Sequence, residues 1–236
     1  MFAAWAVTLT ASATGTDLAD AMTQFKAHLD GTTPLTATQI QTLTTTVTAN
    51  SALLGNTTNL MIQAKVLIQQ YEVSNSLFRT SPTYNGFDRT NFTTVGYAQA
   101  QFMINVMQAF IDDACNAANL AAYPYIFDGF GFETAKYFPG KCNPPSDPNA
   151  VYSVQINASQ TNAWGYEVLF QTDPARRPTG AYLAPGSIAT VTVPAALVNQ
   201  GFTILVGAHT YDKGSGNYLK DKYERLDQVT VRYAIT

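Results

Sequence analysis

The hydrophobic pattern of this 236-residue chain changes its period between the first and the second half. Up to about residue 120, apolar side chains recur every three or four residues, as on one face of a helix. After Ala150 they alternate with polar ones, which is typical of strands. We therefore expect an α+β protein of two segregated parts. A helical bundle at 1–122 and an antiparallel β-sandwich of jelly-roll type at 150–236 would be joined by a connector at 123–149.

Four helices are predicted in the first part. Gly31 follows the first apolar stripe and suits the left-handed end of a helix. Thr36 and Gln39 have the spacing of a capping box, which starts the second helix. The apolar stripes cover about 18–29, 36–54, 57–73 and 94–119. The fourth stripe is apolar over such a broad arc that we place this helix at the centre of the bundle.

The connector is rich in aromatic residues. They are Tyr123, Tyr125, Phe127, Phe130, Phe132, Tyr137 and Phe138. Exposed, these rings would make a stacking platform for sugars, whereas buried they would join the two parts. Burial is the favoured alternative, because large exposed aromatic patches are unusual. Residues 143–148, with three prolines, then predict a stiff linker.

Charge is scarce in this chain. Charged residues make up 12% of it, about half of the usual quarter, and the net charge is −3. This balance gives no attraction for nucleic acid, and a hydroxyl-rich surface suits a secreted protein. Residues 1–15 are apolar but lack the positive start of a signal peptide, which favours a buried helix or strand. No apolar run reaches the ~20 residues of a membrane span.

Two cysteines, Cys115 and Cys142, are present. In an oxidising compartment they could form a disulfide that closes a loop of about 27 residues and contributes roughly 3 kcal/mol. The alternative is two separate buried thiols. Both alternatives stay open on sequence alone.

An ordered set of short motifs marks the second half. Pro178-Thr179-Gly180, Tyr182 and Pro185-Gly186 precede an alternating strand, and a second strand runs into Gly207-Ala208-His209. The segment 225–230 ends the set. This order resembles the β-sandwich domain in front of the catalytic domain of enhancin-like, mucin-degrading zinc metallopeptidases. The helical half is similar, more weakly, to the helical region of the immunomodulating metalloprotease branch of that family.

The resemblance implies a catalytic helix with an H-E-x-x-H zinc motif elsewhere in the protein. This chain has only His28 and His209, and neither has that spacing. We therefore expect no catalytic residue, no zinc ligand and no cofactor in this chain, with zinc confined to a catalytic domain that the chain lacks. The implied partner is the C-terminal peptidase domain of the same polypeptide. The implied location is secreted or on a bacterial cell surface.

Candidate glycan contacts lie on or near loops of the second half. They are Arg176, Arg177, Tyr182, Trp164 and His209. An aromatic face with a few fixed polar groups is typical of carbohydrate sites. Each residue also has a structural interpretation, as a solvated arginine, a core aromatic or a turn histidine. The family motif residues are also interpreted as structural: Pro178, Thr179, Gly180, Tyr182, Pro185, Gly186, Gly207 and His209.

Three functions follow from these observations. The first is a non-catalytic accessory region that supports the peptidase domain and helps to position glycosylated substrate. The second is an independent carbohydrate-binding or adhesion module. A stand-alone enzyme is disfavoured, because no acid, base and metal set converges in the sequence.

Overall fold

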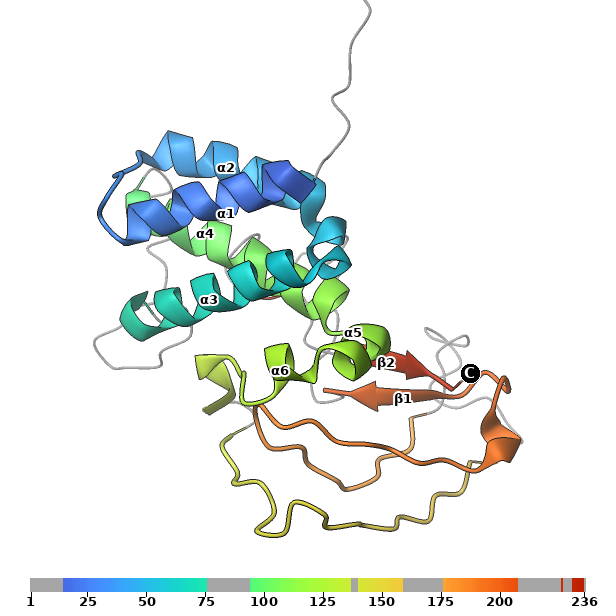
Figure 1. Cartoon of the computed structure of the whole chain (residues 1–236). Helices are drawn as coiled ribbons and strands as arrows, with labels where there is room; N and C mark the ends of the chain where they lie inside the picture. Colours follow the sequence, from blue (N-terminus) through green and yellow to red (C-terminus); the bar gives the residue numbers. More distant parts are fainter. Residues whose placement is uncertain are drawn as a thin grey trace, which may run out of the picture.

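The computed structural model describes residues 15–75, 94–136, 140–158, 176–207, 226 and 231–235. A body of four long helices lies on one side, and extended segments with a small sheet lie on the other (Figure 1). The helical elements are α1 (Gly15–Leu29), α2 (Ala37–Asn50), η1 (Ser51–Asn56), α3 (Thr58–Asn75), α4 (Val95–Ala109), η2 (Phe110–Ala114), α5 (Ala117–Ala122), α6 (Pro124–Phe127), η3 (Glu133–Lys136) and η4 (Ala195–Leu197). The strands are β1 (Thr203–Val206) and β2 (Val231–Ala234).

The start of α2 and the end of α1 follow from local sequence. Gly31 has a φ of +73°, so the predicted left-handed stop of α1 is confirmed. The predicted capping box is also present: the Gln39 backbone N–H donates to Thr36 Oγ1 at 3.3 Å, and the Thr36 N–H donates to Gln39 Oε1 at 2.8 Å. Both devices satisfy backbone groups that a helix end would otherwise leave unpaired.

The centre of the bundle is α4, as its broad apolar arc predicts. It packs against α2 and α3, and the Phe102 ring stacks on Phe25 of α1 with centroids 3.9 Å apart. Nine of its fifteen residues are buried. Burial of this much apolar surface stabilises the bundle, at roughly 1.5–3 kcal/mol for each large side chain.

The predicted fourth helix is not continuous to residue 119. Its last turn widens into the π-type turn η2, and the chain then breaks at Cys115 before α5 begins. Asn116 caps α5, because its side-chain oxygen accepts the Asn119 backbone N–H at 2.9 Å. The break lies where η1 crosses η2, with Gly55 directly against the Asp113 backbone. The crossing of two distant segments therefore ends this helix.

The predicted β-sandwich is wrong for the part of the chain that the structure describes. The described residues are mostly helical, and their sheet has two antiparallel strands, with Thr203 of β1 opposite Ala234 of β2. Segments 151–156 and 188–193 have the alternation of strands, yet they are assigned to no strand. Alternation favours an extended backbone, but a sheet also requires a second strand within about 4.8 Å that supplies hydrogen bonds.

Candidate functional site

The region with the clearest functional meaning is the junction between the helical bundle and the second half. At its upper side the aromatic connector packs on the bundle. Phe110 of η2 lies 5.8 Å from Phe127 and 5.2 Å from Phe130, centroid to centroid. Phe127 is buried, whereas Tyr125 is 63% exposed. The predicted burial of the connector is thus confirmed for Phe127 and wrong for Tyr125, while Tyr137 and Phe138 lie outside the described residues.

Two polar groups of α3 fix the connector in place. Lys65 Nζ donates to the Ile126 carbonyl oxygen at 2.6 Å and lies 5.5 Å above the Phe130 ring. Two turns further along α3, Glu72 Oε2 accepts the Glu133 backbone N–H at 3.0 Å. A hydrogen bond to a charged group contributes about 1.5–3 kcal/mol. The connector is therefore attached to α3 at Ile126 and again at Glu133.

The Pro-Gly part of the family motif packs directly on the connector. The Gly129 N–H donates to the Gly186 carbonyl oxygen at 2.7 Å. Gly186 has a φ of +76°, and a Cβ there would lie 3.0 Å from the Gly129 carbonyl carbon. Only glycine meets both the positive φ and the close backbone approach without strain. This position has a structural role, as its motif suggests.

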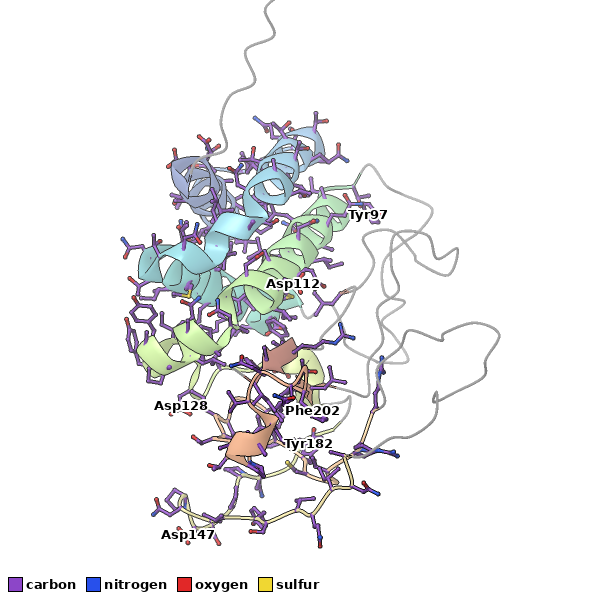
Figure 2. The ribbon with its side chains drawn as sticks, turned by 90° about the vertical axis from the view of Figure 1, so that its right-hand side faces the viewer. Tyr97, Asp112, Asp128, Asp147, Tyr182 and Phe202 are labelled. Carbon is purple, nitrogen blue, oxygen red and sulfur yellow. The ribbon has the colours of Figure 1, made fainter. Side chains whose placement is uncertain are left out.

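Tyr182 binds the same motif to a later part of the connector, at Gly140. Its hydroxyl donates to the Gly140 carbonyl oxygen, while its side chain stays 48% exposed. Figure 2 shows Tyr182 in the lower part of the molecule, below the helices. The hydroxyl is therefore occupied, and the exposed part of the ring is what a ligand could contact.

A cleft of about 430 Å³ opens on the other side of the junction, between η2, α5 and β2. The Tyr233 hydroxyl of β2 spans it and donates to the Cys115 carbonyl oxygen at 3.2 Å. Polar groups at its rim come from Asp112, Asn116 and Arg232, and the Gln108 amide binds both Asp112 oxygens, at 3.0 and 2.9 Å. The cleft is a contact zone between distant elements.

Two titratable groups of the cleft, Cys115 and Tyr233, have raised pKa values. Burial, with the Asp112 charge as the smaller cause, raises the pKa of the Cys115 thiol to about 12. Burial, with Cys115 as the smaller cause, also raises the pKa of Tyr233. A nucleophilic cysteine needs a lowered pKa, because the thiolate is the reactive species. The raised pKa of this buried thiol favours a packing role over a nucleophilic one.

The remaining candidate residues are dispersed. Arg176 and Arg177 are exposed, and Arg177 has an interaction partner. Trp164 and His209 lie outside the described residues, so their predicted glycan contacts stay predictions. Of the structural motif residues, Thr179 Oγ1 accepts the Ala181 N–H at 3.1 Å. Pro185 lies in a turn with Gly186, and Gly180 and Gly207 have positive φ.

His28 is structural. Its Nδ1 accepts the Leu35 N–H at 2.9 Å, and its Nε2 lies 2.7 Å from the Gln99 amide. Within the described ranges, no three His, Cys, Asp or Glu side chains come together as metal ligands, so these residues do not fit a family-type zinc site. Cys115 and Cys142 are free thiols here, and their pairing under oxidising conditions stays a prediction. No described helix combines the length and apolarity that a membrane span requires.

Sequence reasoning missed the cleft and the two anchors on α3. Lys65 and Glu72 have the appearance of ordinary surface residues on a helix, and Tyr233 that of one more residue in an alternating strand. Their partners lie 61 residues away for the helix anchors and 118 residues away for the tyrosine. No local signal could have identified these pairs.

Comparison with known proteins bears on the second half. Residues 147–236 match the family model of the N-terminal domain of M60-like peptidases. The comparisons found no curated protein and no solved structure that matches the chain. The matched range contains the Pro178–Gly186 motif and ends with β2, so the resemblance to enhancin-like peptidases is confirmed over this range. Over residues 147–236 the chain is therefore similar to the N-terminal domain of M60-like peptidases, which is consistent with an N-terminal region of such a peptidase.

Proposed function

We propose that this chain is the N-terminal accessory region of a secreted zinc metallopeptidase that acts on O-glycosylated, mucin-type proteins. The matched domain makes it an accessory part of an M60-like peptidase. The sequence itself contains no H-E-x-x-H motif, so catalysis and zinc belong to the peptidase domain of the same polypeptide. The family match at 147–236 is the observation that carries this proposal.

The proposed role of the chain is support of the peptidase domain. Three hydrogen bonds join the matched domain to the preceding part of the chain. Gly186 and Tyr182 bind the connector, at Gly129 and Gly140. Tyr233 binds Cys115, directly after η2. Each neutral bond contributes about 0.5–1.5 kcal/mol, and together they hold the domain against the helices. A support of this kind presents the matched domain in a fixed orientation.

The experiment compares the peptidase domain alone with the polypeptide that also contains residues 1–236. Thermal unfolding and cleavage of an O-glycosylated protein are measured for both. We expect a higher Tm, a higher kcat/KM or both in the longer polypeptide. A peptidase domain that is equally stable and equally active alone would contradict the supporting role.

Glycan positioning is the finer part of the proposal. Tyr182 offers a half-exposed ring whose hydroxyl is held by Gly140, and the exposed Arg176 and Arg177 lie a few residues away along the chain. A fixed aromatic face beside cations suits an acidic sugar. We expect weak binding, with a Kd of about 0.1–1 mM, or about −4 to −5.5 kcal/mol.

The same residues carry the alternative function, an independent carbohydrate-binding or adhesion module. Calorimetry with sialylated and neutral O-glycans on the isolated chain separates the two. Tyr182→Ala should abolish binding, whereas Tyr182→Phe, which keeps the ring, should retain it. Micromolar affinity would favour the binding module. Equal binding by Tyr182→Ala would exclude this ring as the contact.

A further inference from the structure

His28 joins three elements of the helical bundle through one ring. It lies half-buried in the last turn of α1, and its Nδ1 accepts the Leu35 backbone N–H at 2.9 Å. Leu35 directly precedes Thr36, the N-cap of α2. On the other side of the ring, Nε2 lies 2.7 Å from the side-chain amide of Gln99 in α4. The ring therefore connects the end of α1 to the start of α2 and to α4.

This ring lies at the edge of the hydrophobic core. Phe25, one turn earlier in α1, has its ring centroid 6.0 Å from that of His28 and stacks on Phe102 of α4. Leu35 itself packs on the core. Figure 1 shows the connection between α1 and α2 and the start of α4 at the same end of the bundle. The hydrogen bonds of His28 therefore act on the closure of this end.

The contact with Leu35 requires a neutral ring. A backbone N–H can only donate, so Nδ1 must offer a lone pair and carries no proton. The single proton of the neutral imidazole is then on Nε2, which donates to the Gln99 amide through the amide oxygen. A second proton would turn Nδ1 into a donor that faces another donor. Protonation of the ring therefore breaks the bond to Leu35 and keeps the bond to Gln99.

The charged groups near His28 on its own helix are already paired. Lys26 Nζ and Asp30 Oδ2 form an ion pair at 2.6 Å, and Asp30 Oδ1 accepts the side-chain amide of Gln70 in α3 at 2.5 Å. The hydrogen bond from Lys26 lowers the pKa of Asp30, so this pair persists while an imidazole titrates. The described helices that contact α1 carry these further titratable side chains: Lys65, Tyr71 and Glu72 on α3, Tyr97 on α4, and none on α2.

Two effects of protonation oppose each other. The carbonyl end of α1 attracts a cation in its last turn, although water and salt screen this attraction. Against it stands the loss of the acceptor of a partly buried backbone N–H, with two donors then in direct contact. The second effect is the larger because the two nitrogen atoms lie at hydrogen-bond distance. Protonation therefore weakens the attachment of Leu35 to α1.

We propose that the hydrogen bond between His28 and Leu35 is an acid-sensitive latch of the helical bundle. With the ring neutral, the connection between α1 and α2 is held against α1 and α4. As the pH falls through the range of about 5 to 8 in which an imidazole changes charge, the latch is lost and residues 30–36 open locally. The packing of α3 on α4 remains. This device goes beyond the supporting role proposed for the chain.

Amide hydrogen exchange of the 236-residue chain tests the latch. Protection factors, corrected for the pH dependence of intrinsic exchange, are compared at about pH 7.5 and about pH 5.5, on either side of the imidazole range. We expect the Leu35 protection factor to fall about tenfold, whereas that of Ile104, buried in α4, should change less than about twofold. An unchanged Leu35 factor would overturn the proposal. An equal fall at Ile104 would also overturn it, because the opening would then be global.

Substitutions assign the effect to one histidine. In His28→Asn the side-chain oxygen takes the place of Nδ1 and accepts at any pH, so the Leu35 amide should stay protected at both pH values. In His28→Ala this amide should exchange fast at both. His209→Asn removes the other histidine of the chain and is the matched control, in which the pH-dependent fall should remain. A fall that persists in His28→Asn, or disappears in His209→Asn, would contradict the latch.

NMR of the unsubstituted chain keeps the proposal testable if a His28 variant does not fold. Ring nitrogen shifts at about pH 8 should show His28 as the tautomer with its proton on Nε2. The Leu35 amide shift should change with the same midpoint as the His28 ring. A proton on Nδ1, or a Leu35 amide that does not respond while the His28 ring titrates, would refute the latch.

Discussion

Replacement of Gly55 by alanine tests the close approach of η1 to the backbone of η2. Gly55 lies in η1, which contacts η2 near Asp113. A Cβ on Gly55 would lie 2.7 Å from the Asp113 carbonyl carbon and nearer still to the carbonyl oxygen. Gly55 does not have a positive φ, so alanine brings no backbone strain of its own. The effect of the substitution is therefore one of space.

The magnitude follows from the geometry. Carbon atoms in contact are usually about 3.5–4.0 Å apart, so the carbonyl carbon alone requires η1 and η2 to separate by roughly 0.8 Å, and the nearer carbonyl oxygen requires more. Overpacking costs about 1–3 kcal/mol, and a backbone obstacle puts the cost at the upper end. Alanine recovers at most about 1 kcal/mol of helix propensity. Gly55→Ala should therefore lower the free energy of unfolding by about 2 kcal/mol, which lowers Tm by roughly 4–8 °C.

Gly96→Ala is the matched control. Gly96 lies in α4, and a Cβ there would meet nothing within 4 Å. This substitution should raise the free energy of unfolding by up to about 1 kcal/mol. Urea and thermal unfolding of both variants are followed by far-UV circular dichroism. A loss below about 0.5 kcal/mol for Gly55→Ala would refute the close approach of η1 and η2.

Four further predictions concern the junction. Tyr182→Phe removes the hydrogen bond to Gly140 and should lower the free energy of unfolding by about 0.5–1.5 kcal/mol in urea titration; no change would mean that the bond is absent. At pH 8 the Cys115 thiol, with its pKa near 12, should react with a disulfide reagent far more slowly than Cys142 does, and equal rates would contradict its burial. Because the folded pKa of Cys115 is raised from 9.0, the unfolded chain loses this proton first as pH rises, so the stability present below pH 9 should decline up to about pH 12; this decline should be weaker in Cys115→Ala, and identical pH profiles would exclude the thiol as its cause. Tyr233→Phe should cost about 0.5–1.5 kcal/mol and increase hydrogen exchange in β2, and unchanged exchange would refute a tie through Cys115.

The features that sequence reasoning predicted correctly are local. Thr36 and Gln39 lie three residues apart, and their capping box forms because both partners belong to the same turn. Gly31 stops α1 for a similar reason, since its positive φ depends on the residue itself. The apolar stripe of α4 identified the central helix, because a helix apolar on most sides must be surrounded by others.

The family motif was also recognisable from sequence. The sequence left open whether its residues contact a ligand or only support the fold. The ordered motifs at 178–186, 207–209 and 225–230 indicated an enhancin-like domain over about 150–236, and residues 147–236 match the M60-like N-terminal domain model. The contacts of this motif depend on a segment more than 40 residues earlier in the chain. Gly186 accepts a hydrogen bond from Gly129, and the Tyr182 hydroxyl donates one to Gly140. The structure thereby assigned the motif a docking role.

By itself, the sequence determined where helices begin and end through their own turns, and where the alternating pattern favours an extended backbone. Only the tertiary structure decided that the fourth stripe breaks at Cys115 and that β1 pairs with β2. It also decided that 151–156 and 188–193 are extended without forming strands. The physical reason is that helical hydrogen bonds join residues four apart, whereas a strand or a helix crossing exists only when a distant segment supplies the second half of the contact.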